Sequence, residues 1–222
     1  ADPDINVSAS GLLDFCSYED VTLTAVAGQT YAWSTGETTQ SITTDLAGSY
    51  HAIITTSDGC VDTTANFTTT VFADADISVT TSGGLDFCSY EDVTITAVVG
   101  QSYLWNTGDT TQSITTNQVG SYSFTATTTD GCIDTSAIYT TSIFADPDTS
   151  VVVTQTLFCA SDSAVLIAAP GQGYLWSNGD STQATIVNTT GSYYVTATTI
   201  DGCSGNSDTT SITVVPDIVV PQ

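Results

Sequence analysis

The stretch that decides the fold is the octapeptide FCSYEDVT at residues 15–22, which returns unchanged at residues 87–94. A third, weaker copy begins at Phe158-Cys159. An Asp-Gly-Cys tripeptide follows each copy, at residues 58–60, 130–132 and 201–203. Repetition with a period of about 72 residues indicates an array of similar small units, each one a single structural module.

The repeats divide the 222 residues into domains at 1–73, 74–145 and 146–217, and residues 218–222 are expected to begin a following repeat. The opening Ala-Asp-Pro-Asp returns in related form near residues 73 and 145, so both ends are expected to fall inside a longer tandem array. The linkers are very short. Neighbouring domains are therefore predicted to sit end to end as a semi-rigid rod.

The charge balance is extreme, because the chain has no Lys or Arg against 24 Asp plus Glu, a net charge of −24. Nucleic acid and anionic membrane surfaces are excluded as partners, since both require cations on the protein. No apolar run is long enough to insert into a membrane. Only 11% of the residues are charged, and the Thr- and Val-rich remainder is typical of strands rather than of a disordered acidic tail.

Alternation of apolar and polar residues predicts short strands and no helices. Six or seven strands with frequent turns in about 72 residues favour an antiparallel β-sandwich. In the first repeat, residues 11–20 are expected to form a loop and residues 57–59 a tight turn. The strands are predicted at residues 5–9, 21–26, 31–33, 40–43, 49–56 and 66–72.

The third repeat departs in its short strand, where Thr185 aligns with Ile42 and Ile114 and an isoleucine, Ile186, follows one place later. A shift of one residue exchanges the two faces of a strand, so a bulge or a local slip in register is expected there.

Ordered along the chain, these segments resemble the immunoglobulin-like pattern. Trp33 matches the core tryptophan of strand C, and Tyr50 matches the tyrosine corner before strand F. The pattern Tyr-x-Trp-Ser-x-Gly-x-Thr-Thr-x-Ser-Ile at residues 31–42, then Gly-x-Tyr at 48–50 and Asp-Gly-Cys at 58–60, is similar to the tandem repeats of giant Bacteroidetes cell-surface adhesins, including the SprB-type repeats of gliding motility. The resemblance implies an all-β chain of three tandem immunoglobulin-like sandwich domains on a cell surface.

The six cysteines form one pair per repeat at a constant separation of 44 residues: Cys16 and Cys60, Cys88 and Cys132, Cys159 and Cys203. The tight Cys-x-x-Cys spacing of zinc sites does not occur. Long, fixed spacing in small domains indicates disulfides, and therefore an oxidising extracellular setting.

The spacing does not fix which cysteines pair. Pairing within each repeat is favoured, because a domain this small needs its own cross-link. The alternative joins neighbouring repeats as Cys16–Cys132 and Cys88–Cys203. The immunoglobulin pattern leaves both schemes open, since it places cysteines inside strands B and F, where Ala25 and Ala52 stand here.

The Asp-x-Asp linkers are the best candidates for a metal site. Two or three carboxylates with backbone oxygens suit Ca²⁺, which would stiffen the joint between domains. The other interpretation is that these aspartates cap turns and solubilise the linker. The predicted calcium ligands are Asp74, Asp76 and Asp130 at one joint and Asp146, Asp148 and Asp201 at the next.

Short sequons also predict glycosylation. Asn6, Asn66 and Asn188 stand in Asn-x-Ser/Thr sequences. Thr63, Thr110 and Thr209 stand in Asp-Thr-Thr sequences that resemble the O-glycosylation motif of Bacteroidetes.

These observations predict the stalk of a secreted cell-surface adhesin or filament, whose partners are neighbouring repeats, surface glycans, or copies of itself in a fibre. The alternative is a carbohydrate- or surface-binding module in which Trp33, Trp105 and Trp176 form a stacking platform; core packing is the preferred interpretation of these residues. An enzyme is not expected, because no catalytic constellation stands out in the sequence.

Overall fold

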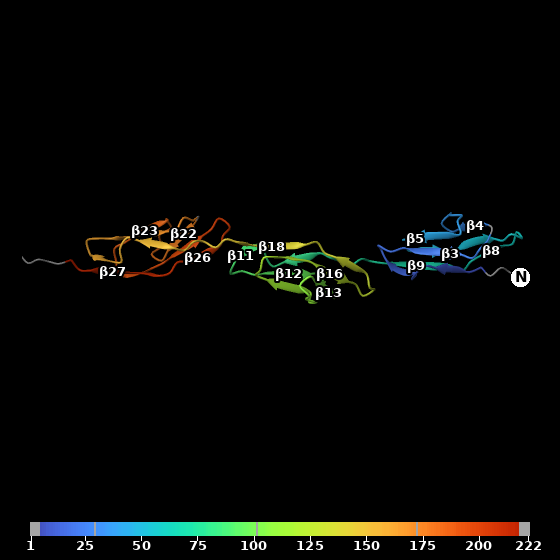
Figure 1. Ribbon diagram of the computed structural model, residues 1–222, viewed down its shortest axis with the longest axis horizontal. Coiled ribbons are helices and arrows are strands. Elements are labelled where there is room, and N and C mark those ends of the chain that lie inside the picture. The colour runs from blue at the N-terminus through green and yellow to red at the C-terminus, as the bar shows by residue number, and fades with distance from the viewer. Residues whose placement is uncertain (1–4, 29, 101, 172, 218–222) are drawn as a thin grey trace, which may run out of the picture. The chain divides into compact units, whose positions relative to one another are not determined.

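The computed structural model describes residues 5–28, 30–100, 102–171 and 173–217. Every helix or strand assigned within these ranges is a β-strand (Figure 1). The strands form three sets of nine, and each set makes three three-stranded sheets. This confirms the predicted fold class, all-β with three immunoglobulin-like sandwich domains. The expected start of a following repeat at residues 218–222 lies outside the described residues.

The strand bounds follow the repeats closely. The first repeat contains β1 (Val7–Ala9), β2 (Asp14–Cys16), β3 (Val21–Ala25), β4 (Thr30–Trp33), β5 (Ser41–Thr44), β6 (Gly48–Tyr50), β7 (Ala52–Thr55), β8 (Val61–Thr63) and β9 (Phe67–Phe72). The second contains β10 (Val79–Thr81), β11 (Asp86–Cys88), β12 (Val93–Ala97), β13 (Ser102–Trp105), β14 (Ser113–Thr116), β15 (Gly120–Tyr122), β16 (Phe124–Thr127), β17 (Ile133–Thr135) and β18 (Tyr139–Phe144). The third contains β19 (Val151–Val153), β20 (Leu157–Cys159), β21 (Ala164–Ala168), β22 (Gly173–Trp176), β23 (Ala184–Val187), β24 (Gly191–Tyr193), β25 (Val195–Thr198), β26 (Ser204–Asn206) and β27 (Thr210–Val215).

The first repeat shows how the sequence makes a sandwich. One sheet has the order β1-β3-β5, and the other two have the orders β4-β7-β8 and β2-β9-β6. Alternation along β3 buries Val21, Leu23 and Ala25 and leaves the threonines between them half-buried. These side chains share one core with Trp33 and Ile54 from the sheet β4-β7-β8 and with Tyr50 from the sheet β2-β9-β6. Both sheet faces therefore contribute to a single small core, and the third repeat is built in the same way around Trp176.

Two compact units divide the chain, and each contains one complete repeat. The first unit comprises Ala1–Thr80, Thr96–Ile114 and Tyr122–Ile138, and the second comprises Thr81–Ile95, Thr115–Ser121 and Tyr139–Gln222. The second repeat is shared between them, because part of it is bonded to the first repeat and part to the third.

Three features of the predicted strand pattern need correction. Residues 14–16, expected to be loop, form β2, which pairs in parallel with β9. Residues 49–56, expected to be one strand, form β6 and β7 with His51 between them. A further strand, β8, follows the Asp-Gly-Cys turn and pairs with β7. β2 ends at Cys16 and β8 begins directly after Cys60, so each of these short strands fixes the position of a cysteine.

The expected slip in the third repeat is wrong. Thr185 pairs with Leu166 as Ile42 pairs with Leu23, so the register is unchanged. Thr185 is buried at 1% exposure, and Ile186 points outward at 68% exposure. The buried hydroxyl of Thr185 is satisfied by the side chains of Asn178, at 2.9 Å, and Asp180. A polar residue with partners replaces isoleucine in the core without moving the strand.

Another buried threonine gives the first prediction. The Thr141 hydroxyl donates to the carbonyl of Gln118 at 2.7 Å and accepts from the amide of Gly120 at 3.0 Å. Thr141→Val keeps the shape but leaves both backbone groups without this partner, so we expect a loss of about 1–3 kcal/mol in the free energy of unfolding. Urea denaturation would measure it. Thr140→Val, on the exposed face of the same strand, is the matched control and should change stability little.

Candidate functional site: the junctions between repeats

Two disulfides join neighbouring repeats, Cys16–Cys132 and Cys88–Cys203, across 116 and 115 residues of sequence. The favoured prediction of pairing within each repeat is therefore wrong, and the alternative scheme is the one observed. Cys60 and Cys159, also predicted as disulfide cysteines, are free and exposed. The cysteines thus act at the joints between domains rather than inside them.

The strand topology explains this pairing. β2 runs parallel to β9 and places Cys16 opposite Phe72, where the chain leaves the first repeat. β6 runs antiparallel to β9, and β7 continues it, so the turn between β7 and β8 lies at the other end of the domain. Cys60 is in that turn. The two cysteines of one repeat are therefore kept apart by the length of the sandwich, and in the first repeat it is Cys16 that lies at the end facing the second repeat.

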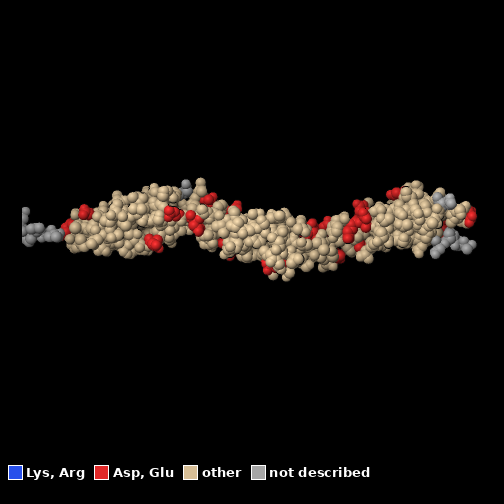
Figure 2. Space-filling view, viewed as in Figure 1, with Lys and Arg blue, Asp and Glu red and all other residues tan. Residues whose placement is uncertain are grey.

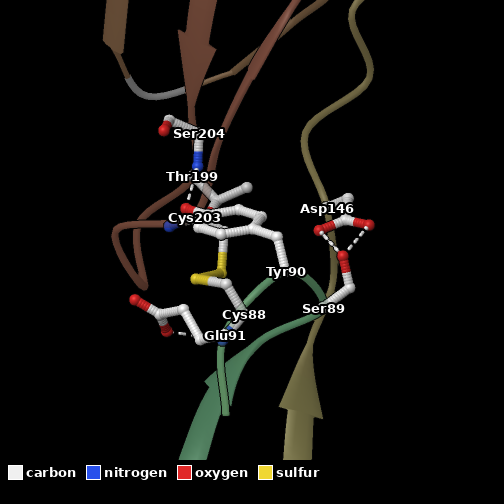
Figure 3. Close-up of a disulfide and its surroundings, with 8 residues drawn as sticks. All are labelled: Cys88, Ser89, Tyr90, Glu91, Asp146, Thr199, Cys203 and Ser204. Carbon is white, nitrogen blue, oxygen red and sulfur yellow. Dashed lines mark hydrogen bonds between the residues drawn. A yellow bond between two sulfur atoms is a disulfide. The ribbon is translucent and has the colours of Figure 1, made fainter. Parts of the chain in front are cut away.

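Figure 3 shows the second junction, where the loop after β11 reaches the turn before β26. The Tyr90 hydroxyl accepts a hydrogen bond from the backbone amide of Ser204 at 3.1 Å. The Ser89 hydroxyl lies 2.7 and 2.8 Å from the two carboxylate oxygens of Asp146, on the linker. The residues beside Cys88 therefore contact both the next repeat and the peptide that leads to it.

Each cysteine is also oriented by a local hydrogen bond. The Glu91 carboxylate accepts from the amide of Cys88 at 2.9 Å, and the Thr199 hydroxyl accepts from the amide of Cys203 at 3.1 Å (Figure 3). The turn at Gly202 has φ of +91°, a conformation that glycine adopts without a steric penalty. The Asp-Gly-Cys tripeptide is therefore a tight turn that presents its cysteine.

The first junction repeats these contacts. Its equivalents are Tyr18 with Ile133 at 3.1 Å, Ser17 with Asp74 at 2.6 Å, Glu19 with Cys16 at 3.0 Å and Thr128 with Cys132 at 3.0 Å. Pairing buries the sulfur-bearing residues: Cys132 and Cys203 are 0% exposed, and Cys16 and Cys88 are 6% and 5% exposed.

Sequence reasoning missed the tyrosines. Tyr18 and Tyr90 are each 58% exposed, and nothing in their strand pattern assigns them a role. The signal that could have found them is that the first two octapeptides are identical even at loop positions. Core packing does not require identical residues in a loop. The third copy has Ser161 at this place.

The predicted calcium ligands have other partners in the structure. Asp74 and Asp146 accept from serine hydroxyls, as described above. Hydrogen bonds from the Ser78 hydroxyl and amide lower the pKa of Asp76, and those from the Ser150 amide and hydroxyl lower the pKa of Asp148. Both are short turns in which a carboxylate caps the backbone.

Asp130 and Asp201 are exposed in their tight turns. Over the described ranges, no group of three or more His, Cys, Asp or Glu side chains is placed to hold a metal ion. Calcium at the linkers stays a prediction, and the local hydrogen bonds favour the turn-capping interpretation. Figure 2 shows acidic side chains distributed over a surface that has no basic residue to balance them.

The exposure of the remaining candidate residues shows which of them belong to the core and which lie on the surface. The tryptophans are core residues: Trp33, Trp105 and Trp176 are at most 4% exposed, and each indole N–H donates to a backbone carbonyl. The tyrosine corner is present, with the Tyr50 hydroxyl 3.0 Å from the carbonyl oxygen of Leu46. The predicted glycosylation residues are all exposed, and their modification stays a prediction: Asn6, Asn66, Asn188, Thr63, Thr110 and Thr209.

The tyrosine contact gives a prediction at the junction itself. Tyr90→Phe removes the acceptor for the Ser204 amide, and water can replace only part of it because the site is exposed. We expect the Cys88–Cys203 disulfide to become easier to reduce by up to about tenfold, the equivalent of one hydrogen bond. Titration against a glutathione redox buffer would measure this. Tyr194→Phe, at an exposed tyrosine of the third repeat, is the control and should leave the equilibrium unchanged.

Comparison with known proteins found similar solved structures. No family model matches the chain, and no curated protein matches its sequence. The ICAM-5 D1–D4 ectodomain fragment is 12% identical and covers 95% of this chain and 76% of its own, with a TM-score of 0.40. Murine CEACAM1b is 13% identical over 96% of this chain and 100% of its own, with a TM-score of 0.28. The four N-terminal immunoglobulin domains of Dscam1 isoform 6.44 are 9% identical, and the match covers 95% of this chain and 72% of the Dscam1 chain, with a TM-score of 0.24.

The strand topology and the shared cores described above define the class, which is that of tandem immunoglobulin-like β-sandwich domains. Disulfide-bonded domains of this kind indicate an extracellular or secreted setting. Within the described ranges, no helix has the length and apolar character needed to cross a bilayer.

Proposed function

We propose that this chain is part of the stalk of a secreted cell-surface adhesin or extracellular filament, in which disulfides make a row of small domains into a semi-rigid rod. The observation that carries the proposal is the placement of both disulfides between consecutive repeats. A bond inside a domain stabilises that domain alone, whereas a bond across a junction restrains how two domains move relative to each other.

Each junction has two covalent connections. One is the linker peptide, for example residues 73–76, and the other is the disulfide Cys16–Cys132. The Tyr18 hydroxyl adds a directed contact to the next repeat, and Ser17 fastens the loop to the linker at Asp74. Two separated attachments oppose pivoting about either one. A row built from such joints resists bending better than one joined by linkers alone.

The composition supports an exposed, long-lived role. A chain without Lys or Arg offers no site to trypsin-like proteases, and its net charge of −24 opposes aggregation of its copies. The similarity to SprB-type adhesin repeats supports the same role at a cell surface. The alternative role in sugar binding loses its stacking platform, because the three tryptophans are buried.

Small-angle X-ray scattering of the three-repeat chain, oxidised and reduced, tests the proposal. We expect the oxidised chain to scatter as a rod with a defined cross-section, and reduction to increase bending at the junctions. Circular dichroism on the same samples would distinguish bending between folded domains from unfolding of the domains. Scattering from freely jointed domains in the oxidised chain would overturn the stalk function.

A further inference from the structure

We infer that the exposed thiols of Cys60 and Cys159 are complementary halves of a further junction of the same design, and that two copies of the 222-residue chain complete it head to tail through a Cys159–Cys60 disulfide. The inference rests on the proposed stalk function and adds its partner, a second copy of this chain. It does not rest on exposed thiols alone, because the same chain contains two completed junctions with both halves in place.

The turn that carries Cys60 already has the conformation of the two bonded turns. Its amide donates to the Thr56 hydroxyl at 3.2 Å, and its carbonyl accepts from the Thr56 amide at 2.9 Å. The equivalent carbonyls accept at 2.9 Å in the first junction and 2.8 Å in the second. Gly59 has φ of +80°, beside +90° and +91° in the bonded turns. We call this turn the receiving half of the junction, because it accepts the cysteine of the other copy. It is preformed, so little ordering is required when a partner binds.

Val61 completes the receiving half. Val61 pairs with Thr55 in the same register as Ile133 pairs with Thr127. Ile133 is the residue whose amide donates to the Tyr18 hydroxyl at the first junction. The amide of Val61 therefore faces outward in the same way, and its side chain is 63% exposed.

The opposite side of the junction, which we call the donating half, is the strand end and loop around Cys159. β20 runs parallel to β27 and sets Cys159 opposite Val215, as Cys16 is set opposite Phe72. The amide of Asp162 donates to the carbonyl of Cys159 at 2.9 Å, the bond that Glu19 makes to Cys16. The hydroxyl of Ser161 donates to Asp217 at 3.2 Å and replaces the contact of Ser17 with Asp74.

One contact of the completed junctions is missing from this half. Ser161 stands where Tyr18 and Tyr90 stand, and its side chain is too short to reproduce their contact with the next repeat. The joint between copies therefore relies on its covalent bond more than the joints within a copy do. Reduction should separate copies before it opens the internal junctions.

The bond forms by two thiol–disulfide exchanges with a small-molecule disulfide such as oxidised glutathione. The Cys159 thiolate attacks one sulfur, releases one reduced thiol and leaves a mixed disulfide. The Cys60 thiolate of a second copy then attacks the Cys159 sulfur and releases the second reduced thiol. Two protein thiols are oxidised and one small disulfide is reduced to two thiols, so electrons and protons balance.

Electrostatics sets the conditions for this reaction. Asp58 lies beside Cys60, and Asp162 lies beside Cys159, with no cation on either side. The two faces repel each other at low ionic strength, and salt at about 0.15 M reduces the range of this repulsion to roughly 8 Å. We expect linkage to become faster as sodium chloride is raised.

Two matched variants make the test specific. Cys60→Ser retains only the donating thiol, and Cys159→Ser retains only the receiving thiol; both positions are exposed, so folding is unaffected. In a glutathione redox buffer, the parent should form a ladder of covalent oligomers on a non-reducing gel. An equal mixture of the two variants should stop at dimers, at least nine-tenths of them heterodimers with a Cys159–Cys60 cross-link identified by mass spectrometry.

Other outcomes overturn the inference. Random pairing would give half heterodimers, and a preference for Cys60–Cys60 or Cys159–Cys159 bonds, a Cys60–Cys159 bond within one copy, or no cross-link at all would each contradict head-to-tail joining. The same peptide maps report Cys16–Cys132 and Cys88–Cys203. If these two bonds are present and no linkage occurs, the further junction fails and the stalk function stands. If they are absent, the stalk function itself fails.

Discussion

Pulled from its two ends in a force spectrometer, the oxidised chain is expected to stop extending at about 280 Å, whereas the reduced chain should reach about 780 Å. The difference arises because the disulfides shorten the covalent path. Force enters at residue 1, crosses from Cys16 to Cys132, returns along the chain to Cys88, and crosses again to Cys203. Only roughly 80 of the 222 residues lie on that path, each contributing at most about 3.5 Å.

The same path determines which strands carry load. In the first repeat, only β1 and β2 precede Cys16, so the residues from β3 onward are shielded once the disulfide is taut. In the third repeat, only β26 and β27 follow Cys203. The oxidised chain should therefore not release the full length of either outer repeat, and only residues 88–132 of the middle repeat bear force throughout.

The control is a variant with all four bonded cysteines changed to alanine. It should reach the longer length with or without reductant. An oxidised parent that extends as far as this variant would show that the bonds do not shorten the path, and would count against mechanical continuity through the disulfides.

Most of the fold could be predicted because its signals are local. Alternation along Val21–Ala25 marks a half-buried strand wherever it occurs, and the repeated Trp and Tyr positions mark the core. The strands that were missed, β2 and β8, are three residues long, too short to show alternation. The pairing of β2 with β9 joins residues more than fifty positions apart, and no local pattern encodes it.

That single pairing also decides the cysteines. With residues 11–20 taken as loop, Cys16 could reach either end of its domain, and the need for a cross-link in a small core favoured the wrong scheme. Once β2 is fixed beside β9, Cys16 is committed to the end that meets the next repeat. Thr185 shows the converse case. Its replacement of an isoleucine suggested a shift in register, but hydrogen-bond partners for its buried hydroxyl allow the register to stay the same.

Removing one junction disulfide should cost much of the stability of the repeats that it joins. In the double variant Cys88→Ala/Cys203→Ala we expect a loss of about 3–5 kcal/mol in the free energy of unfolding, because the bond closes a loop of more than a hundred residues in the unfolded chain. Alanine avoids placing a hydroxyl in the fully buried site of Cys203. A core of this size supplies only about 3–5 kcal/mol by itself, so the loss is comparable to the stability of one repeat.

Hydrogen exchange measures this repeat by repeat, since buried amides in β21 and β25 exchange only when the third repeat opens. Their protection should fall about a hundredfold or more in the double variant, the minimum implied by 3 kcal/mol, whereas amides of β3 and β7 in the first repeat should change little. The matched control is Cys60→Ala/Cys159→Ala, which removes two cysteines that close no loop and should leave protection unaltered. An equal loss in both double variants would mean that cysteine side chains matter for packing and that the cross-link does not. A loss confined to Cys88→Ala/Cys203→Ala ties the stability of one repeat to its covalent bond with the next, which is the property that a row of small domains under tension requires.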